Sequence, residues 1–330
     1  MKPRILLTGK SGQIGSELAA LLPRLGHVTA LGRRELELAS APAVRAAVKR
    51  AAPQVIVNAA AYTDVNGAES HEGRATLINA RAVRVIAEEA AKLGALVVHY
   101  STDYVFDGAK TSPYLETDVP NPLNAYGRSK LAGERALLGS GAPHVVLRTS
   151  WVYGLHGKNF FLSVLRLASE KEQLPIVSDQ TGAPSWSRMI AAATVRVLSR
   201  LLAGGYHPRV AAGFSGIYHL TSGGETSWAG FASAILEEID GTRKTSRQVA
   251  KTMGDKPLKA RTIIPISSQQ FHSPACRPAY SVLSNEKFIR RFGFCLPDWR
   301  EQLRMAICDL PADKVLSVLE QSGACRPVSG

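Results

Sequence analysis

A short apolar strand followed by regularly spaced glycines, close to the start of the chain, constrains the fold most strongly. Residues 4–9 form an apolar run that predicts a buried strand, and residues 16–22 have a helical pattern. Between them lie Gly9, Gly12 and Gly15, each three residues after the last. Such a turn lets backbone amides approach a pyrophosphate at a helix N-terminus, although the bare spacing also fits a tight turn without a ligand. Its place between a first strand and a first helix favours dinucleotide binding.

Further strands and helices alternate along the chain. Apolar strands are expected near residues 27–32, 55–61, 97–100, 144–149 and 216–220, and helices near 41–52, 79–93, 185–202 and 226–239. This alternation predicts an α/β fold with a Rossmann-type, doubly wound parallel sheet. Ligands of such sheets bind beyond the carboxyl ends of the strands, where Gly9, Ala61 and Thr102 are placed. Residues 203–215 show no pattern and are expected to form a loop.

The chain is long enough for two domains. We assign residues 1–150 and about 184–222 to an NADP-binding Rossmann domain. Residues 151–183 and about 223–330 are assigned to a smaller C-terminal α/β domain that binds substrate.

The end of the second strand bears on cofactor choice. An acidic residue there would hold the ribose 2′-hydroxyl of NAD, but the chain reads Gly32-Arg33-Arg34. An arginine suits the 2′-phosphate of NADP, so Arg33 favours NADPH, while NADH remains possible and the arginines could be ordinary loop residues. Glu37 and Leu38 follow and are expected to border the adenine.

Tyr126 and Lys130 are four residues apart, and Pro122 and Asn124 precede them in the manner of a helix start. On a helix the two side chains share one face. An ammonium stabilises a phenolate, so this pair predicts a proton donor for an oxygen that gains charge. The alternative is a surface helix with a half-buried tyrosine. The upstream strand that ends in Ser101-Thr102-Asp103 favours catalysis.

Bulk properties exclude several classes of protein. No apolar run approaches the length of a membrane span, and the N-terminal apolar stretch is too short for a secretory signal, so we expect a cytoplasmic protein without membrane contact. Cys276, Cys295, Cys308 and Cys325 form no Cys-x-x-Cys motif and are interpreted as reduced thiols. The formal net charge is +13, with a basic segment at 243–261. This segment lacks interleaved aromatics, so we expect a solvated face or an attractive rim for a phosphorylated small molecule, and no nucleic acid partner.

Several stretches together resemble the extended short-chain dehydrogenase/reductase superfamily and, within it, the dTDP-4-dehydrorhamnose reductase family. The stretches are Leu7–Gly15, Val57–Thr63, His99–Gly108, Asn121–Glu134, Leu147–Tyr153, Asp179–Pro184, Gly216–Leu220 and Ser273–Pro278. The match runs in order along the chain from residue 4 to about residue 309. A match of this extent is specific to the family and not merely to the fold.

The resemblance implies roles for individual residues. Thr102, Tyr126 and Lys130 fall on the family's catalytic hydroxyl, acid and lysine. Cofactor-binding residues are Gly9, Gly12, Gln13, Ile14, Gly15, Arg33, Glu37, Leu38, Ala61, Tyr62, Thr63, Tyr100, Tyr126 and Lys130. Substrate-binding residues are Thr102, Asp103, Trp151, Asn159 and Arg277.

The chain also departs from the family. Some members hold Mg²⁺ at a dimer interface with several glutamates; Glu17 matches one, but Arg188 and Arg300 occupy other positions. Because arginine repels a cation, we expect no metal, and the chain is either a monomer or a homodimer. Near the C-terminus Tyr280 replaces the family's asparagine, which bears on substrate selectivity.

The implied reaction is the NADPH-dependent reduction of the C4 ketone of dTDP-4-dehydro-L-rhamnose to dTDP-L-rhamnose, a dTDP-linked sugar used for cell-surface polysaccharide. Two alternatives stay open: another nucleotide-sugar 4-ketoreductase or epimerase, and a non-catalytic NADP-binding regulatory subunit. The residues leave the base and sugar of the substrate open, together with the preference for NADPH over NADH.

Overall fold

The computed structural model describes residues 2–245 and 258–310 of the chain, with side chains described outside 242–245. Most of the basic segment 243–261, Cys325 and the tail from residue 311 lie outside this range. The chain divides into two compact units. The first comprises residues 1–150, 187–221 and 273–296, and the second comprises residues 151–186, 222–272 and 297–330.

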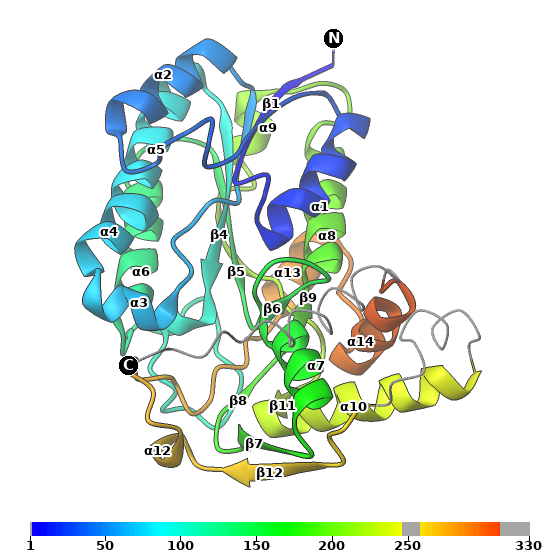
Figure 1. Ribbon diagram of the computed structural model, residues 1–330. Helices are drawn as coiled ribbons and strands as arrows, with labels where there is room; N and C mark the ends of the chain where they lie inside the picture. The colour runs from blue at the N-terminus through cyan, green and yellow to red at the C-terminus, as the bar shows by residue number, and fades with distance from the viewer. Residues whose placement is uncertain (1, 246–257, 311–330) are drawn as a thin grey trace. The chain divides into compact units, whose positions relative to one another are not determined.

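A parallel sheet of six strands forms the centre of the first unit (Figure 1). In spatial order the strands are β10 (Gly216–His219), β5 (His144–Thr149), β4 (Leu96–Thr102), β3 (Val55–Asn58), β1 (Arg4–Thr8) and β2 (His27–Leu31). From β1 the chain adds β2 on one side and every later strand on the other. The switch point of this doubly wound sheet therefore lies between β1 and β3, where ligands of such folds bind. The predicted fold class is confirmed.

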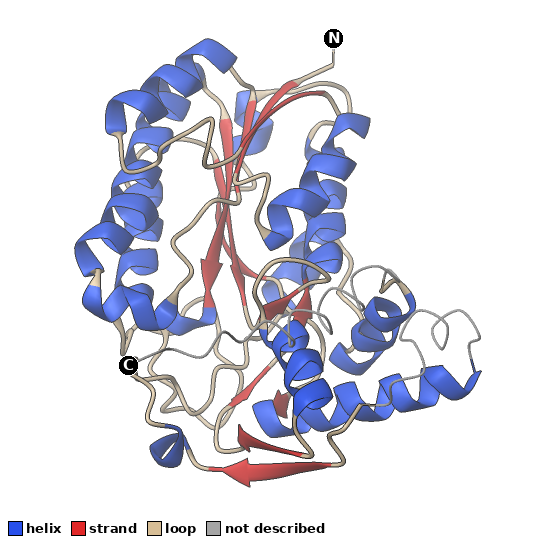
Figure 2. Ribbon diagram, in the orientation of Figure 1, coloured by secondary structure: helices blue, strands red, loops and turns tan. Residues whose placement is uncertain are grey.

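Helices cover both faces of this sheet (Figure 2). One layer contains α2 (Ala41–Ala51), α5 (Ala82–Leu93) and α6 (Ala125–Leu138), and the other contains α1 (Gln13–Leu21) and α8 (Ser187–Leu201). Leu6, Ile56 and Val97 lie in register on β1, β3 and β4 and are completely buried. They pack in one cluster with Val44 of α2 and Ile86 of α5. Burial on both faces explains why these strands read as continuous apolar runs.

Shorter elements complete the first unit. Between β3 and α5 the chain forms α3 (Val65–Ser70), α4 (Glu72–Thr76) and a π-helical segment η2 (Leu77–Arg81), and 3₁₀ turns lie at η1 (Leu22–Arg24) and η3 (Asp103–Val105). Within the predicted loop 203–215 the chain forms α9 (Pro208–Ala212), so that expectation is wrong for these five residues. Pro208 suits the first helical turn, where its missing amide is not needed. Helix α13 (Glu286–Phe292) also belongs to this unit.

The second unit contains the remaining elements. They are β6 (Val152–Tyr153), α7 (Phe160–Glu170), β7 (Gln173–Val177), β8 (Thr181–Gly182), β9 (Ser185–Trp186), β11 (Thr226–Ser227), α10 (Trp228–Thr245), β12 (Thr262–Ile266), α12 (Ser268–Phe271) and α14 (Trp299–Cys308). The strands pair as β12 with β7, β11 with β8, and β6 with β9. Residues 273–296 lie inside the range assigned from sequence to the second domain, yet they pack with the first unit.

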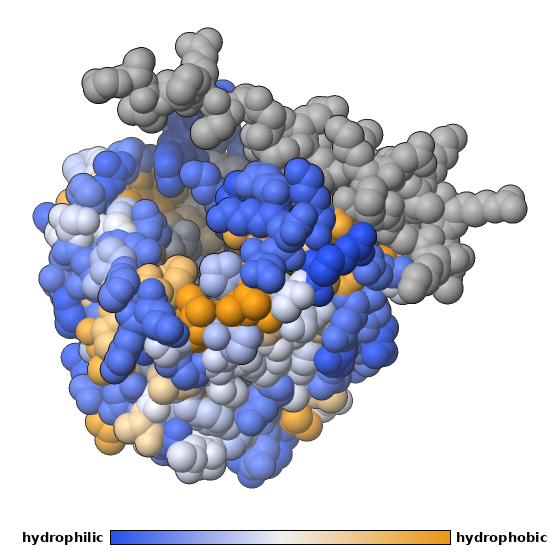
Figure 3. Space-filling view, turned by 60° about the horizontal axis from the view of Figure 1, so that its bottom comes forward, coloured by the Kyte–Doolittle hydropathy of each residue, from blue (hydrophilic) through white to orange (hydrophobic). Residues whose placement is uncertain are grey.

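On the face seen in Figure 3, hydrophobic residues form small patches among hydrophilic ones. Among the residues whose side chains are described, Val119 and Phe271 are the most exposed large apolar ones, at 85% and 53%. Exposed apolar residues that occur singly are normal on protein surfaces. In the part of the chain that the structure describes, no helix has the length and apolar character needed to cross a membrane.

Candidate active site

The glycine turn after β1 lies at the switch point of the sheet. Gly9 has a φ of +78°, and a Cβ atom there would lie 2.6 Å from the backbone nitrogen of Ala60, beyond the end of β3. A Cβ on Gly15 would lie 1.9 Å from the carbonyl oxygen of Gly9. Gly12 precedes α1 in an extended conformation and supplies no side-chain cap. The turn therefore requires glycine and directs a helix N-terminus without a side-chain cap toward the strand ends, which suits a pyrophosphate.

The residues after β2 occupy the position where these folds recognise the adenosine ribose. Arg33 and Glu37 are exposed, whereas Leu38 is partly buried against the core cluster. The Glu35 carboxylate accepts a hydrogen bond from the Gly32 amide at 2.8 Å and pairs with Lys10 at 2.7 Å. These contacts lower the pKa of Glu35, with the Lys10 hydrogen bond as the largest cause. The carboxylate of Glu35, the acidic side chain nearest the end of β2 in this segment, is thus already engaged by a lysine.

The segment after β3 is held by Asn79. Its side-chain oxygen accepts from the Tyr62 amide at 2.8 Å, and its amide nitrogen donates to the Tyr62 carbonyl at 3.0 Å and to the Ser129 hydroxyl at 2.9 Å. Asn79 lies in the π-helical segment η2, a distortion that often occurs at functional sites. It thereby fixes Ala61, Tyr62 and Thr63 at the strand ends. Sequence reasoning missed this residue because its partners are 17 and 50 residues away.

Thr102 and Tyr126 interact through their hydroxyl groups. Thr102 ends β4, and Tyr126 lies in the first turn of α6, which is capped by Asn124 as the sequence predicts. A Cβ on Gly127 would lie 2.1 Å from the Tyr104 carbonyl oxygen, so glycine allows α6 to approach the turn after Thr102. Burial raises the pKa of Tyr126 to about 12, against a smaller opposite effect of the Thr102 hydrogen bond. The phenol therefore keeps its proton at neutral pH and can donate it.

Lys130 lies one turn beyond Tyr126 and is almost completely buried. Its Nζ donates to the Tyr100 carbonyl at 2.6 Å and lies 3.4 Å from Nε2 of His99. Burial lowers the pKa of Lys130 to about 8, while the Glu134 carboxylate acts in the opposite direction. The hydroxyl of Tyr100 is itself bound to Thr194 at 2.7 Å, so Tyr100 contributes its backbone carbonyl to Lys130.

Asp103 is buried directly after Thr102. Its carboxylate accepts hydrogen bonds from the hydroxyls of Thr102 and Ser150, both at 3.0 Å. Burial raises the pKa of Asp103 to about 6, and hydrogen bonds from Ser281, Ser150 and Thr102 oppose this. Asp103 therefore fixes the orientation of the Thr102 hydroxyl. With a pKa of about 6, its carboxyl group gains or loses its proton within the pH range in which enzymes work.

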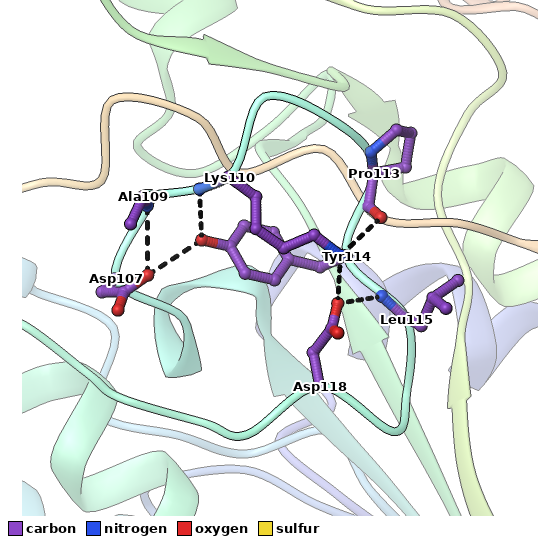
Figure 4. A network of polar contacts seen from close by, with 7 residues as sticks. All are labelled: Asp107, Ala109, Lys110, Pro113, Tyr114, Leu115 and Asp118. Carbon is purple, nitrogen blue, oxygen red and sulfur yellow. Dashed lines mark hydrogen bonds and ion pairs between the residues drawn. The ribbon is translucent and has the colours of Figure 1, made fainter.

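The loop that joins η3 to α6 is ordered by a polar network (Figure 4). The Tyr114 hydroxyl donates to Asp107 at 2.9 Å and accepts from the Lys110 amide at 3.3 Å. The Lys110 ammonium binds Asp118 at 2.6 Å, and Asp118 also accepts from the Leu115 amide at 2.8 Å. Since this loop connects the strand that carries Thr102 to the helix that carries Tyr126, the network keeps both ends in place.

The predicted substrate-binding residues are divided between the units. In the first unit Arg277 hydrogen-bonds Ser273 and Asn66. Burial raises the pKa of the Tyr104 hydroxyl, and Arg277 opposes this increase. The ring of Tyr104 packs edge-on against Tyr126, with 6.1 Å between ring centres.

In the second unit the Trp151 ring stacks on Trp228, with 3.5 Å between ring centres and 3° between planes. Trp151 has a φ of +44°, which is unusual for a residue other than glycine and occurs often at functional sites. Sequence reasoning did not single out Trp228, which is 77 residues away. The side chain of Asn159 caps α7 by accepting from Leu162 at 3.0 Å and donates to the Gly154 carbonyl at 2.9 Å.

The residues considered for a metal site form ion pairs between glutamate and arginine. Glu17 binds Arg188 at 3.1 Å in the first unit, and Arg300 lies 3.5 Å from Glu237 in the second. Among residues 2–245 and 258–310 no three His, Cys, Asp or Glu side chains gather as metal ligands would.

A glycine turn at the switch point of a parallel sheet, with Thr102 at the end of β4 and Tyr126 and Lys130 on α6, defines the chain as an oxidoreductase of the extended short-chain dehydrogenase/reductase type. The family model described as RmlD substrate binding domain matches residues 1–311, and the chain belongs to this family.

Named relatives agree with this assignment. A dTDP-4-dehydrorhamnose reductase of Burkholderia thailandensis is 47% identical over 308 residues, covering 93% of this chain and 99% of the relative. One from Escherichia coli K12 is 40% identical over 310 residues, covering 93% and 97%. The crystal structure of the Bacillus anthracis reductase in complex with NADP has a TM-score of 0.80 and 30% identity, covering 94% of this chain and all of that one.

Proposed function

We propose that this chain reduces the C4 ketone of dTDP-4-dehydro-L-rhamnose with NADPH and forms dTDP-L-rhamnose. Membership of the family and identities of 40% and 47% to reductases of that name support the proposal. The observation that carries it is the place of the Tyr126 phenol beside Thr102, at the carboxyl end of β4, where burial raises the pKa of the phenol. A phenol in that place can protonate an alkoxide as the alkoxide forms.

The residues present fit a dinucleotide. At Gly9 and Gly15 a Cβ would collide with backbone atoms, so glycine permits the tight turn, and the N-terminus of α1 lacks a side-chain cap. In this proposal Gly12, Gln13 and Ile14 bind the pyrophosphate, and Arg33 binds the 2′-phosphate of NADPH. Bound there, the nicotinamide supplies the hydride. Ala61, Tyr62, Thr63 and Tyr100 line its path, while Glu37 and Leu38 border the adenine.

Tyr126 transfers its proton to the oxygen at C4 while that carbon is reduced. Thr102 hydrogen-bonds the same oxygen and holds it against the phenol. Its hydroxyl hydrogen, donated to Asp103 in this structure, turns to that oxygen when substrate binds. Lys130 stabilises the phenolate that remains and holds the nicotinamide ribose. Charge stabilisation of this kind is strong because these groups are buried.

In the second unit, the stacked rings of Trp151 and Trp228 form a flat surface that suits the nucleotide sugar. Arg277 supplies a cation for the substrate's phosphates in the first unit. Asn159 remains a predicted substrate contact, and its capping of α7 also gives it a structural function.

The test is oxidation of NADPH by the purified protein against a panel of dTDP-, UDP- and GDP-linked ketosugars. Turnover with the dTDP-linked 4-ketosugar is expected. Purification with tightly bound NAD and interconversion of epimers would instead identify an epimerase, and binding of NADP without turnover would identify a regulatory subunit. We also propose that the protein is cytoplasmic and is either a monomer or a homodimer. Cell fractionation tests its location, and light scattering distinguishes the two oligomeric states.

A further inference from the structure

A row of buried polar side chains runs across the sheet beneath Lys130. Thr8, Asn58 and His99 lie in register on β1, β3 and β4. The Thr8 hydroxyl is 2.6 Å from Oδ1 of Asn58, Nδ2 of Asn58 is 3.0 Å from Nδ1 of His99, and Nε2 of His99 is 3.4 Å from Nζ of Lys130. All four side chains are at most 2% exposed. Polar groups this deep in a parallel sheet cost free energy unless they are hydrogen-bonded, so their arrangement requires an explanation.

The chemistry of an ammonium fixes what His99 must present to it. An ammonium only donates, so Nε2 has to offer a lone pair, and the ring proton then lies on Nδ1. Burial holds the pKa of His99 well below its usual range, and the charge of Lys130 adds to this, so the ring is neutral.

The hydrogen-bond direction along the row therefore depends on Lys130. With an ammonium, Nδ1–H of His99 donates to the Asn58 amide oxygen, and the amide NH₂ donates to Thr8. With a neutral amine every bond runs the opposite way, from the Thr8 hydroxyl to the lysine. The structure places Nδ2 of Asn58 toward the ring and Oδ1 toward Thr8, as the neutral amine requires. The ammonium form needs a half-turn of the amide, which exchanges donor and acceptor.

We propose that His99, held by Asn58 and Thr8, is a positioning residue that keeps Lys130 in place and favours its ammonium form. It accepts one hydrogen from Nζ while the Tyr100 carbonyl accepts another, which leaves the third directed away from the row. The inference rests on the proposed function, since Lys130 matters to catalysis only if Tyr126 is the acid. His99 itself touches no reacting atom.

Other groups around Lys130 do not replace this contact. On its own helix Glu134 is already neutralised by Arg148 of β5, with contacts of 2.9 and 2.7 Å. From η2, Asn79 approaches α6 through Ser129, and both are uncharged. Tyr126, also on α6, retains its proton. Beside the Tyr100 carbonyl, His99 is thus the neutral side-chain acceptor that distinguishes this lysine from an isolated buried amine.

The test compares His99→Asn with His99→Gln. The asparagine amide reaches the position of Nδ1 and can bind Asn58 but not Lys130, whereas the glutamine amide reaches the position of Nε2. We expect His99→Asn to lower kcat by about 10-fold to 100-fold, as small displacements of a catalytic group do. Its alkaline loss of kcat should move to lower pH by about half a unit or more, because a buried ammonium has lost an acceptor. His99→Gln should recover most of kcat and the wild-type pH profile.

Thermal unfolding of each variant separates this role from a structural one. If His99→Asn lowers only the melting temperature, and its pH profile superimposes on that of the wild type, the inference is overturned. Thr8→Val, at the far end of the row, provides a milder variant and should shift the alkaline limb in the same direction by less. Failure of the wild type to reduce any ketosugar would overturn the proposed function instead, so the two failures are distinguishable.

Discussion

Glu134 and Arg148 form a buried, two-pronged ion pair one helical turn beyond Lys130. Nε and Nη2 of Arg148 donate to the two carboxylate oxygens at 2.9 and 2.7 Å, and the side chains are only 1% and 2% exposed. The guanidinium also lies over the Phe106 ring, 5.1 Å from its centre. The pair joins α6 to β5 and so fixes the helix that carries Tyr126 and Lys130.

Removing one partner of this pair should be costly. Glu134→Gln leaves the Arg148 charge buried without a counter-ion, and we expect a loss of about 3 to 5 kcal/mol in the free energy of unfolding. The control is Glu72→Gln, which breaks the exposed pair with Arg128 and should cost less than about 1 kcal/mol. Urea unfolding followed by circular dichroism measures both. Equal losses in the two variants would show that α6 is not anchored through Arg148.

Tyr126→Phe should separate chemistry from binding. Loss of the acid is expected to lower kcat by about two to four orders of magnitude, while the dissociation constant for NADPH changes little. Stopped-flow NADPH oxidation and fluorescence titration measure the two quantities. Tyr218→Phe, which removes a hydroxyl bound to the Phe214 carbonyl at 3.0 Å, is the matched control and should keep kcat within a few-fold. A Tyr126→Phe enzyme with near-normal kcat would refute the assignment of the acid.

Asp103 should make stability depend on pH in the acid range. Its pKa in the folded state is raised to about 6 by burial, above its value in the unfolded chain. The folded state therefore binds more protons between about pH 4 and pH 6, so the free energy of unfolding falls as pH rises through that window, by about 2 to 3 kcal/mol from this group.

Asp103→Asn should remove this contribution, because the hydroxyls of Thr102, Ser150 and Ser281 that bind Asp103 can rotate to suit an amide. Urea midpoints at several pH values from 4.5 to 7.5 test the expectation. The free energy of unfolding of the variant, relative to that of the wild type, should increase as pH rises to about 6 and stay constant above pH 6. A difference that does not change with pH would contradict it.

Gly15 should tolerate no side chain. A Cβ there would overlap the Gly9 carbonyl oxygen at 1.9 Å, so Gly15→Ala must displace the turn at the switch point. We expect NADPH binding to be lost and the melting temperature to fall. Gly73→Ala in α4 is the control, since no atom lies within 4 Å of its Cβ, and alanine there should add up to about 1 kcal/mol of helix stability. Unchanged NADPH affinity in Gly15→Ala would remove the pyrophosphate from this turn.

Local patterns were sufficient to predict the central sheet and the start of α6. The apolar strands, the glycine turn and the Asn124 cap each depend on neighbours within a few residues, and the structure confirms them. Contacts between distant segments left no such signal: Asn79 holds Tyr62, and Trp228 stacks on Trp151.

Helices α13 and α14 were not predicted either. Both are short, and they lie in a region where no helix was expected from the sequence. The direction of the Tyr126 pKa was likewise beyond sequence reasoning. A neighbouring lysine was expected to lower it, but burial raises it, and burial is known only from the fold.

Arg33 should determine the preference between the two nicotinamide cofactors. It is exposed at the end of β2, and the adjacent carboxylate of Glu35 is held by Lys10 and the Gly32 amide, so it cannot freely accept from a ribose hydroxyl. Arg33→Ser removes a charge-assisted contact with the 2′-phosphate, worth about 1.5 to 3 kcal/mol, and should raise KM for NADPH about ten-fold or more. KM for NADH should not change, because NADH has no phosphate there, and this makes NADH the internal control. Initial rates at varied concentrations of each cofactor provide the measurement. If KM for NADPH and KM for NADH rise equally, Arg33 acts on the conformation of the loop and not on the 2′-phosphate. If neither KM rises, Lys10 is the cation that faces the 2′-phosphate.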